Sequence, residues 1–373
     1  MPNPLSAVVL AAGEGKRMRS SLPKPLHRLC GRPMVLHVLD ALDGLEVQQV
    51  VVVVGSGGTA VAKAISDEIR PKARLHFVEQ PIRRGTGDAL AVGLTALDDD
   101  SDEGDVVVLP GDTPLLTPPT LSSLVERHRS ADLAATLLVA VVGDAAGYGR
   151  IVRGKSGGVT SVVEHGDATA EQLQVAEVNT SVYCFRRSVL APSLRRLSTA
   201  NAQGEHYLTD VIAVLASAGY RVDTLSVDDP AEVAGVNDRV QLAAAEARLR
   251  ERLNRSWMSR GVTMVDPATV YVDSSVELEP EVLLHPGVSL AGRTVVRRGA
   301  EIGSGCRLVD TVVGEEAVLE RTESRSAVIG AGARVGPFAV LQPGADVPAG
   351  SDNGPFFLAD LKRGGRVGLP DPV

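Results

Sequence analysis

The chain has 373 residues, room for two domains, and a formal net charge of −8 with only 3% aromatic residues. An acidic, aromatic-poor chain lacks the basic and stacking surfaces of nucleic-acid-binding proteins, so we expect no nucleic-acid partner. No apolar run is long enough to span a membrane, and the N-terminus lacks the pattern of a secretory signal. The three cysteines form no CxxC pair. We therefore expect no membrane partner, no zinc site and a reduced, cytoplasmic setting.

The first predicted element is a buried strand at residues 7–10 that runs into a glycine-rich, basic turn. The turn begins with small residues, which let backbone amides approach a ligand closely: Ala11, Ala12 and Gly13. Two cations, Arg17 and Lys24, follow on the same loop. The combination suits the phosphates of a nucleoside triphosphate. A tight strand-to-helix turn with two surface cations is the alternative interpretation.

The spacing of this turn matches neither a Walker A loop nor a dinucleotide-binding fingerprint. Residues 10–24 instead resemble the LAAGxGxRM…PK signature of sugar-1-phosphate nucleotidyltransferases. The short spacer before Lys24 is similar to that of the GlmU family, the bacterial N-acetylglucosamine-1-phosphate uridyltransferases. The resemblance implies that Ala11, Ala12 and Gly13 bind nucleotide and that Arg17 and Lys24 are catalytic. Lys16 replaces the family's threonine and adds a third cation.

Apolar runs alternate with helical stretches through the first part of the chain. Residues 50–54 and 105–109 are apolar and rich in β-branched residues, as in strands covered on both faces, whereas residues 36–42 and 87–97 have helical patterns. This alternation predicts an α/β, Rossmann-like domain with a mostly parallel sheet. Together with the resemblance it predicts a nucleotidyltransferase domain over residues 1–230. Ligands bind at the carboxyl ends of such strands, where the Gly13 turn and Asp112 both lie.

Two residues are candidate ligands for Mg²⁺. Asp112 follows a buried strand, and Mg²⁺ prefers a few protein oxygens together with phosphates. Asn237 precedes a long helical stretch and, by position alone, fits a helix N-cap better than a metal ligand. Residues 236–242 resemble the family motif V-N-x-R-x-Q-L, however, which implies that Asn237 is the second metal ligand and leaves Asp238 to cap the helix.

Further motifs resemble the family's base-binding and sugar-binding segments. Residues 80–89 resemble Q-x(4)-GTGHA, with Asp88 in place of histidine. The Gln80 side chain both donates and accepts, which suits the imide edge of uracil, and Gly85 and Thr86 add contacts. Four later segments imply a sugar pocket, in which Ser181 replaces a glycine of the family. The implied sugar-binding residues are Gly149, Glu164, Asn179, Tyr207 and Thr209.

The second part of the chain has a six-residue period. Residues 231–260 form a predicted linker helix, and from Val272 an aliphatic residue recurs at every sixth position, with a phase slip at residues 313–327. This period predicts a solenoid, with an ordinary β-rich domain as the alternative. The repeats resemble the left-handed parallel β-helix of hexapeptide acyltransferases and of the second GlmU domain. We expect a short, truncated left-handed β-helix over residues 261–352 and a tail over residues 353–373.

The resemblance weakens toward the end of the chain. Gln342 replaces an arginine that binds sugar phosphate in the family, Asn353 takes an interior place, and the family's acetyltransferase residues would lie past Val373. His285 does not match them and is expected to face outward from the solenoid. We therefore expect no acetyltransferase activity. Because the family's β-helix drives trimerisation, we expect a homo-oligomer, a trimer if the shortened helix suffices.

These parts imply Mg²⁺-dependent uridylyl transfer from UTP to N-acetylglucosamine-1-phosphate. The sugar-phosphate oxygen is already an anionic nucleophile, so no general base is required, and catalysis consists of positioning and charge neutralisation. Three alternatives remain. The chain could use another sugar-1-phosphate, as Lys16, Asp88 and Ser181 suggest. It could be an inactive nucleotide-sugar-binding paralogue that acts as an assembly module. A hexapeptide acyltransferase is disfavoured by the missing catalytic residues.

Overall fold

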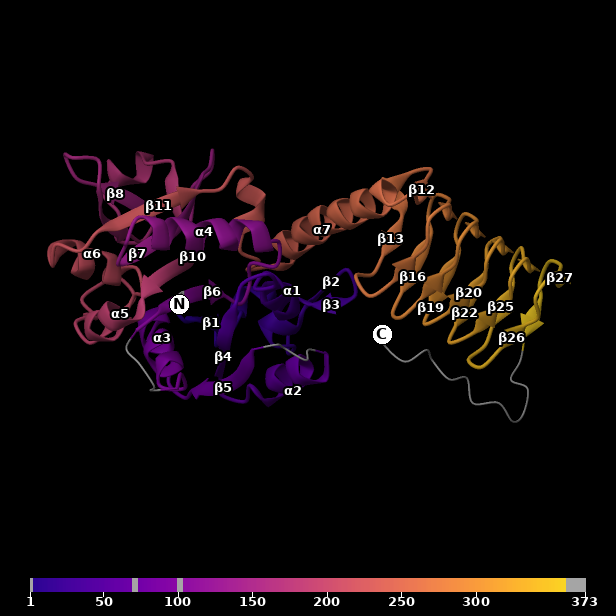
Figure 1. Ribbon diagram of the computed structural model, residues 1–373, viewed down its shortest axis with the longest axis horizontal. Helices are drawn as coiled ribbons and strands as arrows, with labels where there is room; N and C mark the ends of the chain where they lie inside the picture. Colours follow the sequence, from indigo (N-terminus) through magenta and orange to yellow (C-terminus); the bar gives the residue numbers. More distant parts are fainter. Residues whose placement is uncertain (1–2, 69–72, 99–102, 360–373) are drawn as a thin grey trace. The chain divides into compact units, whose positions relative to one another are not determined.

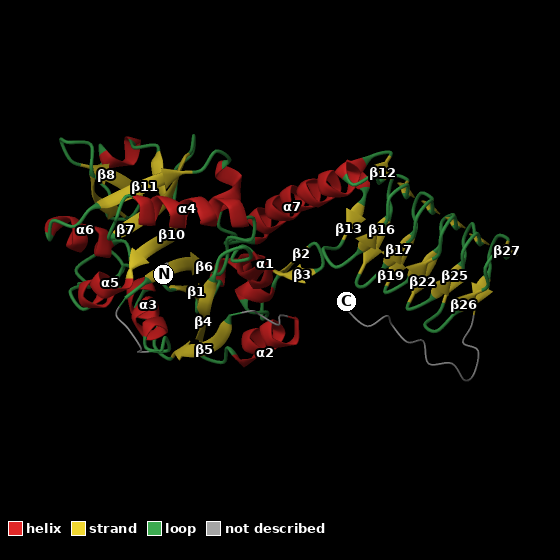
Figure 2. Ribbon diagram, in the orientation of Figure 1, coloured by secondary structure: helices red, strands yellow, loops and turns green. Residues whose placement is uncertain are grey.

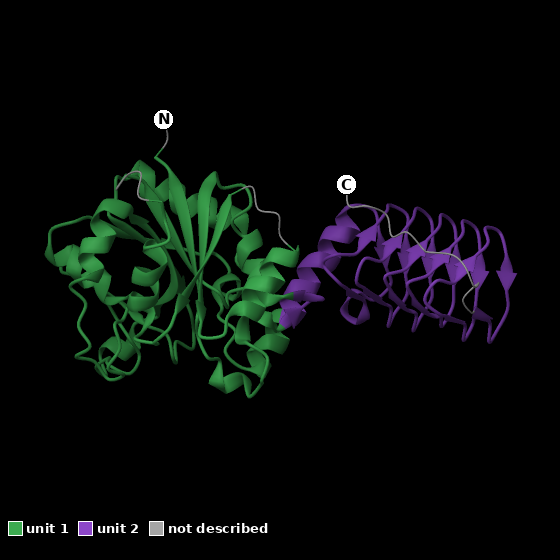
Figure 3. Cartoon of the chain, turned by 90° about the horizontal axis from the view of Figure 1, so that it is seen from below, with its two compact units in different colours: residues 1–27, 33–245 green, residues 28–32, 246–373 purple. Residues whose placement is uncertain are grey.

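The computed structural model describes residues 3–68, 73–98 and 103–359, so the end of the predicted tail, residues 360–373, lies outside the described residues. The chain forms two compact units (Figure 3): residues 1–27 with 33–245, and residues 28–32 with 246–373. The division falls inside α7 (Arg239–Ser259), which lies within the predicted linker. Among the described residues, no helix is long and apolar enough to cross a membrane.

A mixed, mostly parallel sheet forms the centre of unit 1 (Figures 1 and 2). In spatial order its main strands are β11 (Val222–Ser226), β7 (Ala135–Val141), β10 (Glu177–Arg186), β6 (Asp105–Pro110), β1 (Leu5–Ala11), β4 (Val47–Gly55) and β5 (Arg74–Gln80). Strand β10 runs antiparallel to both neighbours, and the other adjacent pairs are parallel. The predicted α/β fold is confirmed. An antiparallel pair, β8 (Arg150–Arg153) and β9 (Val159–Val163), attaches to β10.

Helices cover both faces of this sheet because successive strand residues point to opposite sides. In β1, Ala7 and Val9 belong to one buried core and Val8 belongs to the other. The first core includes residues of α1 (Met34–Asp40), α2 (Thr59–Glu68) and α4 (Pro118–Ser130). The second includes residues of α3 (Thr86–Leu94), α5 (Arg187–Leu194) and α6 (Asp210–Ser217). The strands of the sheet are therefore buried on both faces, as their apolar sequences predict.

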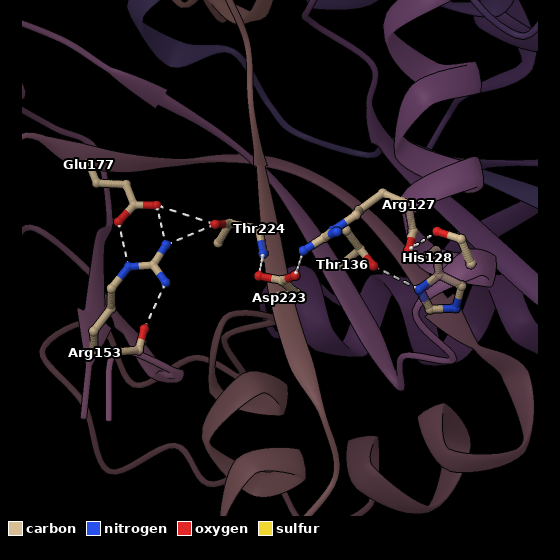
Figure 4. Close-up of polar contacts among 9 residues, drawn as sticks. Arg127, His128, Thr136, Arg153, Glu177, Asp223 and Thr224 are labelled. Atoms are coloured by element: carbon tan, nitrogen blue, oxygen red, sulfur yellow. Dashed lines mark hydrogen bonds and ion pairs between the residues drawn. The ribbon is translucent and has the colours of Figure 1, made fainter. Parts of the chain in front are cut away.

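Side-chain contacts tie the edge strand β11 to its neighbours (Figure 4). Arg153 of β8 donates to both carboxylate oxygens of Glu177 in β10, at 2.9 and 2.6 Å, and to the Thr224 hydroxyl of β11 at 2.8 Å. Asp223 of β11 pairs with Arg127 of α4. An arginine that binds both oxygens of a carboxylate holds the two side chains in one relative orientation, in addition to pairing their charges. These bonds therefore help to position β8 beside the sheet.

Unit 2 is a parallel β-helix built from three sheets, which fits the predicted left-handed β-helix. The first sheet contains β12 (Thr263–Met264), β15 (Leu283–Leu284), β18 (Glu301–Ile302), β21 (Val318–Leu319), β24 (Arg334–Val335) and β27 (Asp352–Asn353). The second contains β13 (Tyr271–Val272), β16 (Ser289–Ala291), β19 (Arg307–Val309), β22 (Glu323–Arg325), β25 (Val340–Leu341) and β28 (Leu358–Ala359). The third contains β14 (Glu277–Leu278), β17 (Val295–Val296), β20 (Val312–Val313), β23 (Val328–Ile329) and β26 (Asp346–Val347). Strands β2 (Arg28–Leu29) and β3 (Arg32–Pro33) form a separate small sheet.

The strand register continues through the region of the expected phase slip. Leu308 pairs with Ser324, which pairs with Leu341, so the second sheet is unbroken. The sequence loses residues at the corners between strands, which changes the period without changing the pairing. Ser324 occupies a place that an aliphatic residue holds in other turns, and its hydroxyl lies 2.9 Å from that of buried Thr311. This hydrogen bond makes the polar substitution compatible with the interior.

We expect Leu308→Ala to lower the free energy of unfolding of the β-helix by about 2–5 kcal/mol, because Leu308 is fully buried and its truncation leaves a cavity. The chain's one tryptophan, Trp257, packs against the β-helix core, so its fluorescence during urea denaturation reports on this unit. Arg307→Ala is the matched control, because it removes only an exposed ion pair worth about 0–1 kcal/mol. Equal destabilisation by both changes would contradict the packing described.

Candidate active site

Four parallel strands of unit 1 end at the same edge of the sheet. Gln80 at the end of β5 is aligned with Gly55 at the end of β4, and Ala11 of β1 is aligned with Val54 of β4. On the other side of β1, Leu10 is aligned with Pro110 of β6. The turns after β1 and β6 carry Gly13 and Asp112. This alignment brings the predicted nucleotide-binding and metal-binding segments to one edge.

The glycine-rich turn has two glycines with different roles. Gly15 has φ +64°, and a Cβ built on it would lie 2.6 Å from the Lys24 Cβ, so both the backbone and the approach of Lys24 require glycine. A Cβ at Gly13 would meet nothing within 4 Å, so this part of the turn faces open space that a ligand can use. Arg83 braces the turn, since its Nε donates to the Ala12 carbonyl at 3.2 Å and its guanidinium pairs with Glu14. Sequence analysis assigned no role to Arg83.

Lys24 lies between the two predicted metal ligands. Its ammonium forms an ion pair with Asp112 and donates to Asn237 Oδ1 at 2.8 Å, and its side chain is only 11% exposed. The Val236 amide donates to the Asp112 carbonyl at 2.8 Å and thereby holds the Asn237 segment in place. A carboxylate oxygen and an amide oxygen thus face one cation, and such hard oxygen donors fit Mg²⁺. The described residues contain no group of three or more His, Cys, Asp or Glu side chains that could hold a metal.

The hydrogen bonds at the start of α7 show whether the Asn237 side chain caps the helix or is free to bind a metal. The backbone N–H of Gln241 donates to Asp238 Oδ1 at 2.8 Å, so Asp238 provides the side-chain acceptor for the helix start. The backbone N–H of Asn237 donates to Gln241 Oε1 at 2.7 Å, which completes a reciprocal pair of caps. The Asn237 side chain is therefore directed to Lys24 and is free of the capping role.

Arg17 differs from Lys16 and Lys24, the cations on either side of it in the turn. It is exposed in the short helix η1 (Lys16–Met18) and makes no hydrogen bond or ion pair with the described part of the chain. Lys16, which replaces the family's threonine, pairs with Glu14 at 3.0 Å. Lys24 is held by two oxygens, whereas the positive charge of Arg17 is available to an anionic ligand.

The predicted base-binding segment is well ordered by its own contacts. Gln80 is 3% exposed, and its Nε2 donates to the Gly85 carbonyl at 3.2 Å and to Asp88 Oδ2 at 2.8 Å. The Thr86 hydroxyl accepts a hydrogen bond from the Leu208 amide at 3.0 Å. The structure thus brings Gln80, Gly85 and Thr86 together, and it ties Thr86 to the segment that contains Tyr207 and Thr209.

The predicted sugar-binding residues form a second cluster. A Cβ on Gly149 would lie 3.5 Å from Glu164 Oε2 and 3.6 Å from the Asn179 Cβ. The backbone N–H of Asn179 donates to the Gly149 carbonyl at 2.9 Å. The Thr209 hydroxyl donates to Glu164 Oε1 at 3.0 Å. Burial raises the pKa of Glu164 above its ordinary value. Tyr207, 8% exposed, lies near the same carboxylate.

Asn179 is oriented by a residue that sequence analysis did not identify. Its Nδ2 donates to the Tyr183 hydroxyl at 2.8 Å, and its Oδ1 is buried without a partner among the described residues. Burial raises the pKa of Tyr183, so this hydroxyl stays neutral. A buried, unpaired carbonyl oxygen is costly unless a ligand satisfies it. The alternation of polar residues along Glu177, Asn179, Ser181 and Tyr183 is the sequence signal that could have indicated Tyr183.

Tyr148 connects this cluster with the metal-binding segment. Burial raises its pKa, and the negative charge of Asp112 raises it further, which places the Tyr148 ring in the electrostatic range of Asp112. Strand β10 enters the sheet beside the end of β6, since Tyr183 is aligned antiparallel with Val108. The sugar cluster and Asp112 are therefore neighbours at the same edge.

Ser181 has a backbone conformation that favours glycine, the residue expected here from the family motif. Its φ is +62°, and it lies in a register shift of β10 between Asn179 and Val182. The left-handed region is unfavourable for residues with a Cβ. The shift itself explains why glycine suits this position.

We expect Ser181→Val to lower the free energy of unfolding by about 1–3 kcal/mol, because a β-branched residue is strained at this φ, whereas Ser181→Gly should be tolerated. Thermal unfolding followed by circular dichroism measures the effect. Ser161→Val in β9 is the matched control at an ordinary strand position, where valine is favourable. A Ser181→Val protein as stable as the control protein would contradict the strain argument.

Comparisons with known proteins agree with this geometry. A model of the MobA-like NTP transferase domain matches residues 7–219. Bifunctional protein GlmU of Streptomyces coelicolor is 46% identical over 357 residues, which cover 95% of this chain and 73% of the relative. Bifunctional protein GlmU of Kineococcus radiotolerans is 45% identical over 98% of this chain and 74% of the relative. The protein of that name from Mycobacterium bovis is 44% identical over 95% of this chain and 72% of its own length. The chain therefore belongs to the GlmU family and is a sugar-phosphate nucleotidyltransferase.

Proposed function

We propose that this protein transfers a uridylyl group from UTP to N-acetylglucosamine-1-phosphate in the presence of Mg²⁺, giving UDP-N-acetylglucosamine and pyrophosphate in the cytoplasm. The observation that carries the proposal is the meeting of Lys24, Asp112 and Asn237 beside the open turn at Gly13. Three segments distant in sequence supply a cation, two oxygen ligands and a free backbone at one edge of the sheet. This set suits the binding of a triphosphate and its metal.

The chain's own residues account for charge and position. Asp112 and Asn237 would hold Mg²⁺, which when bound supplies neutralisation of the phosphate oxygens. The exposed Arg17 is available for the negative charge that builds on the leaving pyrophosphate. Lys24 is confined by Gly15 and by two oxygens, so its ammonium stays close to the phosphates. The sugar phosphate attacks with an oxygen that is already anionic, so no side chain has to remove a proton.

Recognition of the two substrates is divided between the two clusters. Gln80 with Gly85 and Thr86 would bind the base. In the sugar cluster, Glu164 and the unpaired Asn179 Oδ1 can accept hydrogen bonds from N–H and O–H groups, which suits the hydroxyls and the amide of an N-acetylated sugar. A Cβ at Gly149 would lie 3.1 Å from Val162 Cγ1, so glycine permits the close packing of this cluster, which Tyr207 and Thr209 would complete.

A second candidate function is nucleotidyl transfer to a different sugar-1-phosphate. The observation in its favour is Ser181, whose side chain lies in the register shift of β10 beside Asn179. Pyrophosphate release with a panel of nucleoside triphosphates and sugar-1-phosphates separates the two functions. Tight UTP binding without turnover on any sugar phosphate would instead favour an inactive nucleotide-sugar-binding paralogue.

For the β-helix we propose an assembly role without acetyl transfer. Gln342 stands in place of the family's phosphate-binding arginine and removes a positive charge from that position. Assays of acetyl-CoA consumption with glucosamine-1-phosphate test the absence of acetyl transfer. Sedimentation of the full chain tests whether it forms a homo-oligomer, with a trimer as the expected state.

We expect Asp112→Ala to reduce uridylyl transfer by at least about 100-fold, the scale of removing one preorganised electrostatic group. Pyrophosphate release from UTP and N-acetylglucosamine-1-phosphate measures the effect. Chelation of divalent cations should abolish turnover of the unmodified protein, and added Mg²⁺ should restore it. Asp67→Ala removes an exposed carboxylate of α2 and is the matched control. Near-normal turnover in Asp112→Ala would overturn the proposed function.

A further inference from the structure

The contact between Asp88 and Gln80 has a direct effect on the side chain that is proposed to bind the base. Asp88 lies in the first turn of α3, at the position where the family motif has histidine. Its Oδ2 accepts from Gln80 Nε2 at 2.8 Å, and the Gly85 carbonyl accepts from the same nitrogen at 3.2 Å. Gln80 is 3% exposed, so these contacts replace water as the partners of its NH₂ group.

The two partners fix the orientation of the Gln80 amide. A carboxylate and a backbone carbonyl can only accept hydrogen bonds, so the amide must turn its NH₂ group toward them. Both N–H groups are then used. The hydrogen bonds of the Gln80 side chain to described residues use only Nε2, so Gln80 Oε1 is left over. Because Gln80 ends β5 beside Gly55, in the row of strand ends that includes β1, the free oxygen belongs to the edge where the nucleotide would bind.

We propose that Asp88 is a specificity-determining positioning residue, which holds the Gln80 amide so that its oxygen is the only group offered to the base. An acceptor at this place selects a base whose edge carries a ring N–H. Uracil has such a donor at N3, whereas N3 of cytosine can only accept and would face another acceptor. The inference rests on the proposed function, because it assumes that Gln80 reads the base of the nucleotide substrate.

Without Asp88 only the Gly85 carbonyl, at 3.2 Å from Gln80 Nε2, would oppose rotation, and the amide could rotate by half a turn. It would then present its NH₂ group to cytosine N3, and the discrimination would be lost. A buried acceptor that faces another acceptor is penalised by roughly the worth of a lost hydrogen bond, about 5- to 20-fold in affinity. Asp88 contributes this factor through Gln80 and has no predicted contact with the substrate itself.

The test compares kcat/KM for UTP and CTP at saturating N-acetylglucosamine-1-phosphate. We expect Asp88→Ala to lower the UTP:CTP ratio about tenfold, through the KM of the nucleotide, with kcat for UTP and the KM of the sugar phosphate little changed. Asp88→Asn keeps an oxygen that can accept from Gln80 and should retain most of the preference. Asp67→Ala should leave the ratio at the wild-type value. Asp88→Ser, favourable at a helix start but too short to reach Gln80, replaces the alanine variant if that protein does not fold.

A double-mutant comparison tests whether Asp88 acts through Gln80. In the Gln80→Ala background, Asp88→Ala should cause no further change in the UTP:CTP ratio. A wild-type ratio in Asp88→Ala, or a further change in the double variant, would overturn the inference. Calorimetric binding of UTP and CTP gives the same ratio without turnover. If the wild-type protein turned over no sugar phosphate, the proposed function would fail, while the binding ratio would still decide the role of Asp88.

Discussion

The contact of one ammonium with two oxygens organises the candidate active site. Lys24, Asp112 and Asn237 come from three separate segments of unit 1, and each depends on a different local feature. Gly15 leaves the space through which Lys24 passes, the end of β6 presents Asp112, and the Val236 amide holds the Asn237 segment against Asp112. Close charges that are partly buried attract strongly, because little water screens them. The same contact keeps two oxygen ligands together and holds a cation where phosphates would bind.

In the proposed site, recognition on both sides of this contact would rely on two amide side chains whose orientation is fixed by neighbours. Asp88 and the Gly85 carbonyl occupy the NH₂ group of Gln80, and Tyr183 occupies that of Asn179. In each case a carbonyl oxygen remains for the ligand. An asparagine or glutamine that can rotate would accept either hydrogen-bond pattern. The neighbours of these two amides would therefore make them selective for ligand groups that donate hydrogen bonds, and in Asn179 the remaining oxygen is buried without a partner among the described residues.

The sequence predicts the fold well because burial has a distinct period in each unit. Residues 50–54 and 105–109 are apolar at every position, as strands covered on both faces must be, and the six-residue period follows the flat faces of the β-helix. The phase slip at residues 313–327 was harder to interpret, because residues lost at corners alter the period although the strands stay paired.

In the site, motif resemblance placed Asp112 and Gln80 in segments that meet at one edge. Arg83 and Tyr183 were missed, since their roles arise from contacts across strands and turns. By sequence position, Asn237 fits a helix N-cap better than a metal ligand. The hydrogen bond from the Gln241 backbone amide to Asp238 shows that Asp238, and not Asn237, caps α7.

The corners of the β-helix have a consequence for how this unit can change. A turn of the β-helix that is one residue shorter keeps its three strands paired. The stacking of the turns therefore does not depend on the exact number of residues in each turn. Strand identity is carried by single inward-facing side chains, each in contact with the turns above and below. Each corner is therefore a place where an insertion can be grafted without disturbing the layers beneath it. Such a surface can acquire new loops, and with them new partners, while the enzyme in the other unit keeps its chemistry.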